Sequence, residues 1–209
     1  ERFEREIKLA ARLQHPHILG LYDSGVADGL MYYVMPFVKG ESLRDRLDRE
    51  SMLPLDDALR ITLEVCGALQ HAHEQGIVHR DIKPENLMIG ETGVVKIGDL
   101  GLAFHVGQAE VDDEVGVMGT PHFCAPEQVT RGKLDHRTDL YALGATMYRM
   151  LAGKPPFVGQ TLKEILVKKV KEKPMPLVEA VKGLPPAVND LVMQLLERNP
   201  ADRPQSAEE

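Results

Sequence analysis

One eight-residue segment constrains this chain more than any other: His79-Arg80-Asp81-Ile82-Lys83-Pro84-Glu85-Asn86. Phosphoryl transfer depends on positioning and charge neutralisation more than on covalent chemistry. Asp81 can orient a hydroxyl group and accept its proton, and Lys83 can reach a transferring phosphate. Asn86 offers an oxygen ligand of the kind that Mg²⁺ prefers. The segment therefore predicts a site for phosphoryl transfer.

Further motifs follow in a fixed order along the chain. Asp99, in Asp99-Leu100-Gly101, comes just after an apolar run at 94–97 and supplies a second carboxylate for a metal ion. Later come Gly119-Thr120-Pro121, Ala125-Pro126-Glu127, Asp139 within 139–144, and Arg203 within 198–204. In this order, the motifs resemble those of the eukaryotic-type (Hanks-type) serine/threonine protein kinase catalytic domain, most closely its bacterial members. The resemblance covers essentially the whole chain.

Two positions depart from the family pattern, and two others indicate the class of kinase. Ile82 stands where the family usually has Leu, and Leu100 stands where it usually has Phe; both exchanges keep an apolar side chain. Lys83, two residues after Asp81, and Thr120, before Ala125-Pro126-Glu127, resemble serine/threonine rather than tyrosine kinases. The resemblance implies transfer of the γ-phosphoryl group of ATP to Ser or Thr hydroxyls of protein substrates, with ATP and Mg²⁺, or Mn²⁺ in its place, as cofactors.

The resemblance also implies a set of nucleotide contacts. Glu6 matches the helix glutamate whose partner is a strand lysine on the phosphates. Met35 matches the gatekeeper position, and the backbones of Pro36 and Val38 are expected to bind adenine. Met88 is expected to pack under the adenine ring.

Other matched residues are expected to hold the structure together. By resemblance, His79 packs against Leu100 rather than moving protons, and Asp139 is the buried helix carboxylate that holds the catalytic-loop backbone. Glu127 and Arg203 are expected to form a structural ion pair.

A regulatory hypothesis concerns the segment between Asp99 and Gly119, which contains no Ser, Thr or Tyr. In kinases of this type, an arginine at the position of Arg80 usually meets a phosphate on this segment. The bacterial enzymes that the chain resembles commonly carry phosphorylated threonines six and eight residues before the position of Thr120, where this chain has Glu114 and Asp112. One interpretation is that fixed carboxylates replace the phosphates in part, because a carboxylate carries less charge; the other is an acidic loop without this role.

Hydrophobic periodicity predicts an α+β chain with a kinase-like architecture. Residues 1–38 are expected to be a remnant of a small, strand-bearing N-lobe, and residues 39–209 a large, mainly helical C-lobe that is incomplete at its C-terminal end. Helices are predicted at 3–13, from Ser42 to about 49, and at 55–74, 138–151, 161–171 and 187–197. Strands are predicted at 18–22, 30–35, 87–89 and 94–97. Residues 39–42 are expected to be a loop, and residues 98–125 to be irregular.

Composition excludes several classes of protein. The 209 residues carry a formal net charge of −7, which argues against nucleic acid as a partner, because phosphate binding needs clustered Lys and Arg. The two cysteines are too few for a disulfide framework. Residues 1–5 are not expected to be a signal peptide, and no apolar run in this sequence is long enough to span a membrane. A cytoplasmic location is expected, although an anchor outside this segment stays open, and the sequence does not indicate whether the protein dimerises.

The family's Gly-rich loop and strand lysine precede the Glu6 helix, and this sequence does not contain them. Both ends of the sequence look cut. Two alternatives follow: a piece of an active kinase, or a truncated, non-catalytic binding or scaffolding module. The intact Asp81, Lys83, Asn86 and Asp99 favour the first. We expect the 209 residues alone to transfer phosphate poorly, and the small lobe to expose apolar strand surface.

Three other features have simpler interpretations. The pairs His15/His17 and His71/His73 could suggest a metal, but the second pair lies on a predicted helix, where residues two apart diverge. Cys124 is expected to be a small packing residue beside the substrate loop. The run 168–173 is expected to be a solvated helix end.

Overall fold

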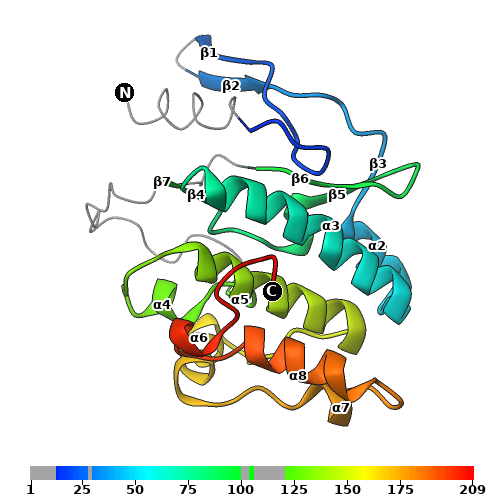
Figure 1. Ribbon diagram of the computed structural model, residues 1–209, viewed down its shortest axis with the longest axis vertical. Coiled ribbons are helices and arrows are strands. Elements are labelled where there is room, and N and C mark those ends of the chain that lie inside the picture. Colours follow the sequence, from blue (N-terminus) through cyan, green and yellow to red (C-terminus); the bar gives the residue numbers. More distant parts are fainter. Residues whose placement is uncertain (1–12, 28–29, 100–103, 106–120) are drawn as a thin grey trace.

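The computed structural model describes residues 13–27, 30–99, 104–105 and 121–209. A small strand-bearing part lies above a larger helical part in Figure 1, with the central strands and helix α3 between them. This arrangement confirms the predicted α+β, kinase-like fold class. The predicted helix at 3–13 falls almost wholly outside the described residues.

Strands β1 (Asp23–Ala27) and β2 (Leu30–Val34) form an antiparallel pair, with Asp23 opposite Val34 and Ala27 opposite Leu30. The predicted strand at 18–22 is therefore wrong, because the chain uses the turn-like Asp23-Ser24-Gly25 as strand. A Cβ at Gly25 would lie 2.6 Å from the hydroxyl of Tyr32, so a larger residue here would require that ring to shift. Ile18 instead makes an isolated parallel bridge to Ile97.

A three-stranded antiparallel sheet has the order β3 (Gly40–Ser42), β5 (Leu87–Gly90), β6 (Val95–Ile97). Strand β3 replaces the loop predicted at 39–42. Its backbone runs so close to β5 that a Cβ at Gly40 would overlap the carbonyl oxygen of Ile89. Within the segment predicted to be irregular, the described residues Phe104–His105 form a short strand, β7, which pairs with β4 (Ile77–Val78).

The two longest described helices end within one residue of the predicted positions. Helix α3 (Leu55–Glu74) is followed by Gly76, and helix α5 (His136–Ala152) by Gly153; both glycines have a φ of 72°. Ser42 caps α2 (Leu43–Glu50) as expected. The remaining described helices are α4 (Pro126–Val129), α6 (Leu162–Lys171), α7 (Leu177–Ala180), α8 (Pro186–Leu195) and the 3₁₀ turns η1 (Pro84–Asn86) and η3 (Pro200–Asp202).

Helix α5 is the centre of the helical part and packs against α3 and α8. It is buried on nearly all sides, including Leu143, Met147 and Met150. Each such side chain contributes about 1.5–3 kcal/mol by leaving water. The residues that α5 presents to the catalytic loop therefore stand on a rigid support.

Large apolar side chains are exposed on the strand-bearing part, as expected. Phe37 is 91% exposed, and Tyr22 and Leu30 are about three-quarters exposed, at 74% and 75%. None of the helices in the described part of the chain combines the length and the apolar character needed to cross a bilayer.

Candidate active site

The catalytic loop is held from below by one buried carboxylate. Asp139, on α5, accepts hydrogen bonds from the backbone nitrogens of His79 (2.8 Å) and Arg80 (2.6 Å). Its Oδ2 also lies 2.8 Å from Nε2 of His73, on α3. These bonds hold Arg80 in a left-handed conformation with a φ of 70°, which is costly for a residue with a Cβ. The structure thus places Asp139 where the sequence predicts.

The ring of His79 is 1% exposed and bonded through both nitrogens. Nε2 lies 2.9 Å from the carbonyl oxygen of Gly98, and Nδ1 accepts from the backbone nitrogen of Asp81 at 3.3 Å. A carbonyl requires a donor and an N–H requires an acceptor, so we assign the neutral tautomer with the proton on Nε2. Leu100, the predicted packing partner, lies outside the described residues.

Two side chains of the loop, those of Lys83 and Asn86, donate to one carboxylate oxygen of Asp81. Lys83 Nζ donates to Oδ2 of Asp81 at 2.5 Å. The amide nitrogen of Asn86 donates to the same oxygen at 3.0 Å and to the backbone oxygen of Asp81 at 2.7 Å. Asp81 is 9% exposed, so this cluster is a desolvated, charge-assisted network.

Asp99 is brought to the same place by the β5–β6 pair. The nitrogen of Gly98 donates to the carbonyl oxygen of Asn86 at 2.8 Å, and Asp99 follows directly. Asp99 has a φ of 56° and is exposed, in contrast to the buried loop below it.

The side chains of Asn86 and Asp99 offer oxygen donors of the kind that a divalent cation prefers. The amide nitrogen of Asn86 donates to Asp81, so its amide oxygen remains available to bind a metal ion. Among the described residues, no group of three or more His, Cys, Asp or Glu side chains could hold a metal on its own. A pair of oxygen ligands suits Mg²⁺, which commonly takes one or two protein oxygens and completes its shell with phosphates and water.

The predicted adenine contacts lie on the segment that leads into the sheet. Met35 is 46% exposed, and Pro36, Val38 and Met88 are partly buried. Strand β3 begins two residues after Val38 and pairs Ser42 with Met88. Val38 therefore lies just before β3, while Met88 lies on the neighbouring strand β5, two residues after Asn86.

Glu127 and Arg203 form the predicted ion pair. Two guanidinium nitrogens of Arg203 contact the two carboxylate oxygens of Glu127 at 2.7 and 2.8 Å. Thr138 donates to the same carboxylate at 3.0 Å. The arginine also donates to backbone carbonyls, including that of Arg137 at 2.8 Å, so the pair ties α4 to α5 and to the segment after η3.

Four predicted residues, Glu6, Asp112, Glu114 and Thr120, lie outside the described residues. Sequence reasoning did not predict the contacts of Gln128, which donates to the carbonyl oxygen of Arg80 at 2.9 Å and accepts from the nitrogen of Ala125 at 2.7 Å. Nothing in the local pattern signals the contact with Arg80, because it joins residues 48 positions apart.

The histidine pairs do not form a metal centre in the described part of the chain. His71 stacks on His15 with ring centroids 5.3 Å apart, while His73 turns to Asp139. The predicted divergence of His71 and His73 is confirmed.

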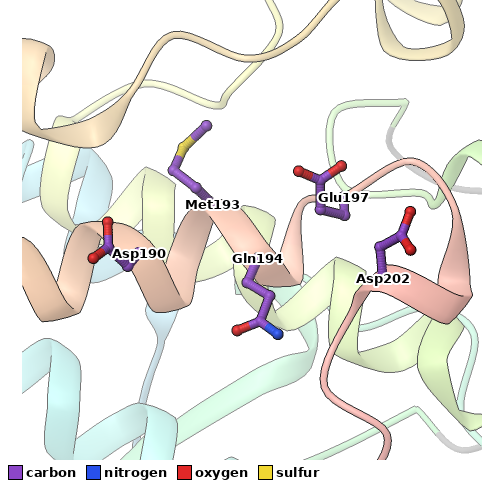
Figure 2. A pocket seen from close by; sticks show the side chains of 5 residues that line it. All are labelled: Asp190, Met193, Gln194, Glu197 and Asp202. Atoms are coloured by element: carbon purple, nitrogen blue, oxygen red, sulfur yellow. The ribbon is translucent and has the colours of Figure 1, made fainter.

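A hollow of about 390 Å³ lies beside α8 and η3, lined by Asp190, Met193, Gln194, Glu197 and Asp202 (Figure 2). Its lining includes no residue of the catalytic loop, and its three carboxylates would repel ATP phosphates. It is therefore not the nucleotide site.

Comparison with known proteins gives one family for the whole chain. The protein kinase domain model matches residues 1–209. A probable serine/threonine-protein kinase of Clostridium perfringens is 38% identical over 208 residues, covering 100% of this chain and 30% of that protein. Serine/threonine-protein kinase PknB is 37% identical in both Mycobacterium leprae and Mycobacterium tuberculosis, covering 100% of this chain and 34% of each relative. The chain thus spans about a third of the length of these relatives.

Proposed function

The chain belongs to the protein kinase domain family, and we propose that it is the catalytic part of an ATP-dependent serine/threonine protein kinase. The observation that carries this proposal is the convergence of Lys83 and Asn86 on Asp81, on a loop whose backbone is bonded to Asp139. The substrates proposed are proteins with an accessible Ser or Thr hydroxyl.

Asp81 is proposed to be the residue that meets the acceptor hydroxyl. Its Oδ2 is occupied by Lys83 and Asn86, so Oδ1 is the oxygen left to orient the hydroxyl and to take its proton. Lys83 lies within reach of an incoming phosphate and neutralises charge that develops during transfer. His79 has no proton-transfer role in this scheme, because both of its nitrogens hold backbone groups.

The nucleotide and metal contacts are proposed by resemblance and supported by position. The oxygen of Asn86 and the carboxylate of Asp99 would hold Mg²⁺, with Mn²⁺ as a second candidate, and the bound ion would neutralise phosphate charge. Met35, Pro36 and Val38 would line the adenine site, with Met88 beneath the ring and Glu6 oriented toward the phosphate-binding lysine. The net charge of −7 supports protein rather than nucleic acid as the substrate.

The test uses the full-length gene product and transfer of labelled phosphate from ATP to casein and to the protein itself. Asp81→Asn is expected to lower kcat by about a hundredfold or more while nucleotide binding is retained. Asp190→Asn, in the hollow beside α8, is the matched control and should leave kcat unchanged. Wild-type activity in Asp81→Asn would refute the assignment, and a wild-type protein that binds partners without transferring phosphate would favour a scaffolding module.

A further inference from the structure

Lys169 is buried although it lies in a charged run. It is 1% exposed, and Ile165, one turn earlier on the same face of α6, is 5% exposed. The interpretation of residues 168–173 as a solvated helix end is therefore wrong at this position. The helical periodicity places Lys169 on the buried face of α6.

The ammonium of Lys169 has few partners for a buried cation. Nζ donates to the carbonyl oxygen of His122 at 3.0 Å and lies over the rings of Tyr141 and Phe157, at 4.9 and 5.7 Å from their centroids. Burial lowers the pKa of Lys169 to about 8. Because a buried charge costs free energy and methionine could fill the same volume, packing alone does not account for a lysine here.

The segment that Lys169 contacts leads directly to the catalytic loop. The ring of His122 is bonded to the carbonyl oxygen of Phe157 at 3.1 Å, so residue 122 is held from the α5–α6 connection as well as from α6. At the other end of the segment, Ala125 is bonded through Gln128 to the carbonyl oxygen of Arg80. Cys124, between these two anchors, is buried, and this burial is the main reason why its pKa is raised. Residues 121–125 thus connect Lys169 to the backbone of Arg80, the residue before Asp81.

We propose that Lys169 is a positioning residue that holds the segment 121–125 in place and thereby sets the position of the acceptor hydroxyl beside Asp81. This inference rests on the proposed function. The ammonium acts through the backbone carbonyl of His122 and touches neither ATP nor the reacting atoms. Its loss should therefore weaken use of the acceptor protein and leave use of ATP unchanged.

Because the proposal depends on the charge of Lys169, it predicts that use of the acceptor protein changes with pH. The groups that face it are Cys124, Glu127 and His122 from the 121–130 segment, Tyr141 from α5 and Arg203 after η3. Burial raises the pKa of the Cys124 thiol above its ordinary value of 9.0 and that of the Tyr141 hydroxyl far above 10.0. Neither group therefore titrates near pH 8, where the ammonium of Lys169 loses its proton.

The experiment measures KM for casein and KM for ATP between pH 6.5 and 9 in the full-length protein. In the wild type, KM for casein should rise as the pH passes about 8. Lys169→Met should raise KM for casein about tenfold at pH 7, the size expected for a charge-assisted hydrogen bond, and should abolish the rise near pH 8. Lys168→Met, one residue away and partly exposed, should match the wild type. Lys169→Gln keeps a donor and should lie between the wild type and Lys169→Met.

A second measurement separates this proposal from the proposed function. Amide hydrogen exchange in residues 122–125 should be about tenfold faster in Lys169→Met than in the wild type, with residues 77–79 unchanged. A wild-type protein that transfers no phosphate refutes the proposed function, and the exchange rates then still test the anchoring of the segment. Unchanged exchange, or equal rises in both KM values, would overturn the role of Lys169.

Discussion

Arg203 and Glu127 are 76 residues apart in sequence, yet they form a buried ion pair in which each carboxylate oxygen meets its own guanidinium nitrogen. Arg203 is 2% exposed, and Glu127 is 7% exposed. Neither charge can be solvated if its partner is lost, so the pair makes the fold depend on contact between α4 and the segment after η3.

Arg203→Ala is therefore expected to lower the free energy of unfolding by about 3–5 kcal/mol, the usual effect of leaving one buried charge unpaired. Urea denaturation measures this difference. The exposed pair of Lys39 and Glu91, at 2.9 Å, supplies the control: Lys39→Ala should change stability by less than about 1 kcal/mol. A similar small loss in Arg203→Ala would contradict the buried-pair interpretation.

Asp139→Asn should damage both stability and activity. The carboxylate faces three donors, from His73, His79 and Arg80, and asparagine would turn an amide N–H toward one of them. We expect a loss of about 1–3 kcal/mol in the free energy of unfolding and a fall in kcat as the catalytic loop shifts.

Thermal unfolding and kcat with casein check this prediction. The matched control is Asp48→Asn, whose carboxylate is 56% exposed and pairs only with Arg44 among the interactions described for it. If Asp139→Asn had the same unfolding temperature and the same kcat as Asp48→Asn, the supporting role of Asp139 would be refuted.

The sequence predicts the long helices well because their signals are local. Helix α3 has the predicted bounds, and α5 differs from prediction by two residues at its start and one at its end. Strand β1 was misplaced because Asp23-Ser24-Gly25 has turn chemistry, while its partner β2 decides its structure. Tertiary pairing of this kind overrides local preference.

In the candidate site, too, contacts between residues close in sequence are predictable and contacts between distant residues are not. Asp81, Lys83 and Asn86 are near neighbours in sequence, and their convergence follows from a spacing that can be read directly. His73 and Lys169 were misread or missed because their partners, Asp139 and His122, lie 66 and 47 residues away. A charged run also conceals the helical period that buries Lys169.

Asp99→Asn should weaken the response to Mg²⁺. Replacing a charged oxygen ligand by a neutral one reduces attraction for a divalent cation, so half-maximal activity should need several-fold more Mg²⁺, with kcat lowered about a hundredfold or more. Activity measured against Mg²⁺ concentration at constant ATP tests this. Asp202→Asn is the control, and removal of divalent cations by chelation should abolish activity in all variants.

The hypothesis that Asp112 and Glu114 replace activating phosphates can be tested in the full-length protein. Asp112→Ala combined with Glu114→Ala should lower kcat several-fold, because the segment would lose the charges proposed to order it. Glu110→Ala, in the same acidic segment, should have little effect. Unchanged activity in the double variant would leave only the interpretation of an acidic loop.

Lys169 should also leave a signature in stability against pH. Its pKa is about 8 in the fold, against an ordinary value of 10.5, so between these values the unfolded chain binds more protons than the folded one. The contribution of Lys169 to the free energy of unfolding must then increase with pH between these two values. Relative to Lys169→Met, the wild type should gain about 3 kcal/mol between pH 8 and 10.5, at about 1.4 kcal/mol per pH unit. Urea denaturation of both proteins at several pH values gives the difference, in which contributions from unaltered groups cancel.

The control is Lys168, whose pKa is raised by its hydrogen bond to Glu164. The difference in stability between the wild type and Lys168→Met should change with pH in the opposite direction. A flat difference for Lys169→Met would mean that the lysine is not held as a buried cation, and its proposed hold on His122 would lose its physical basis.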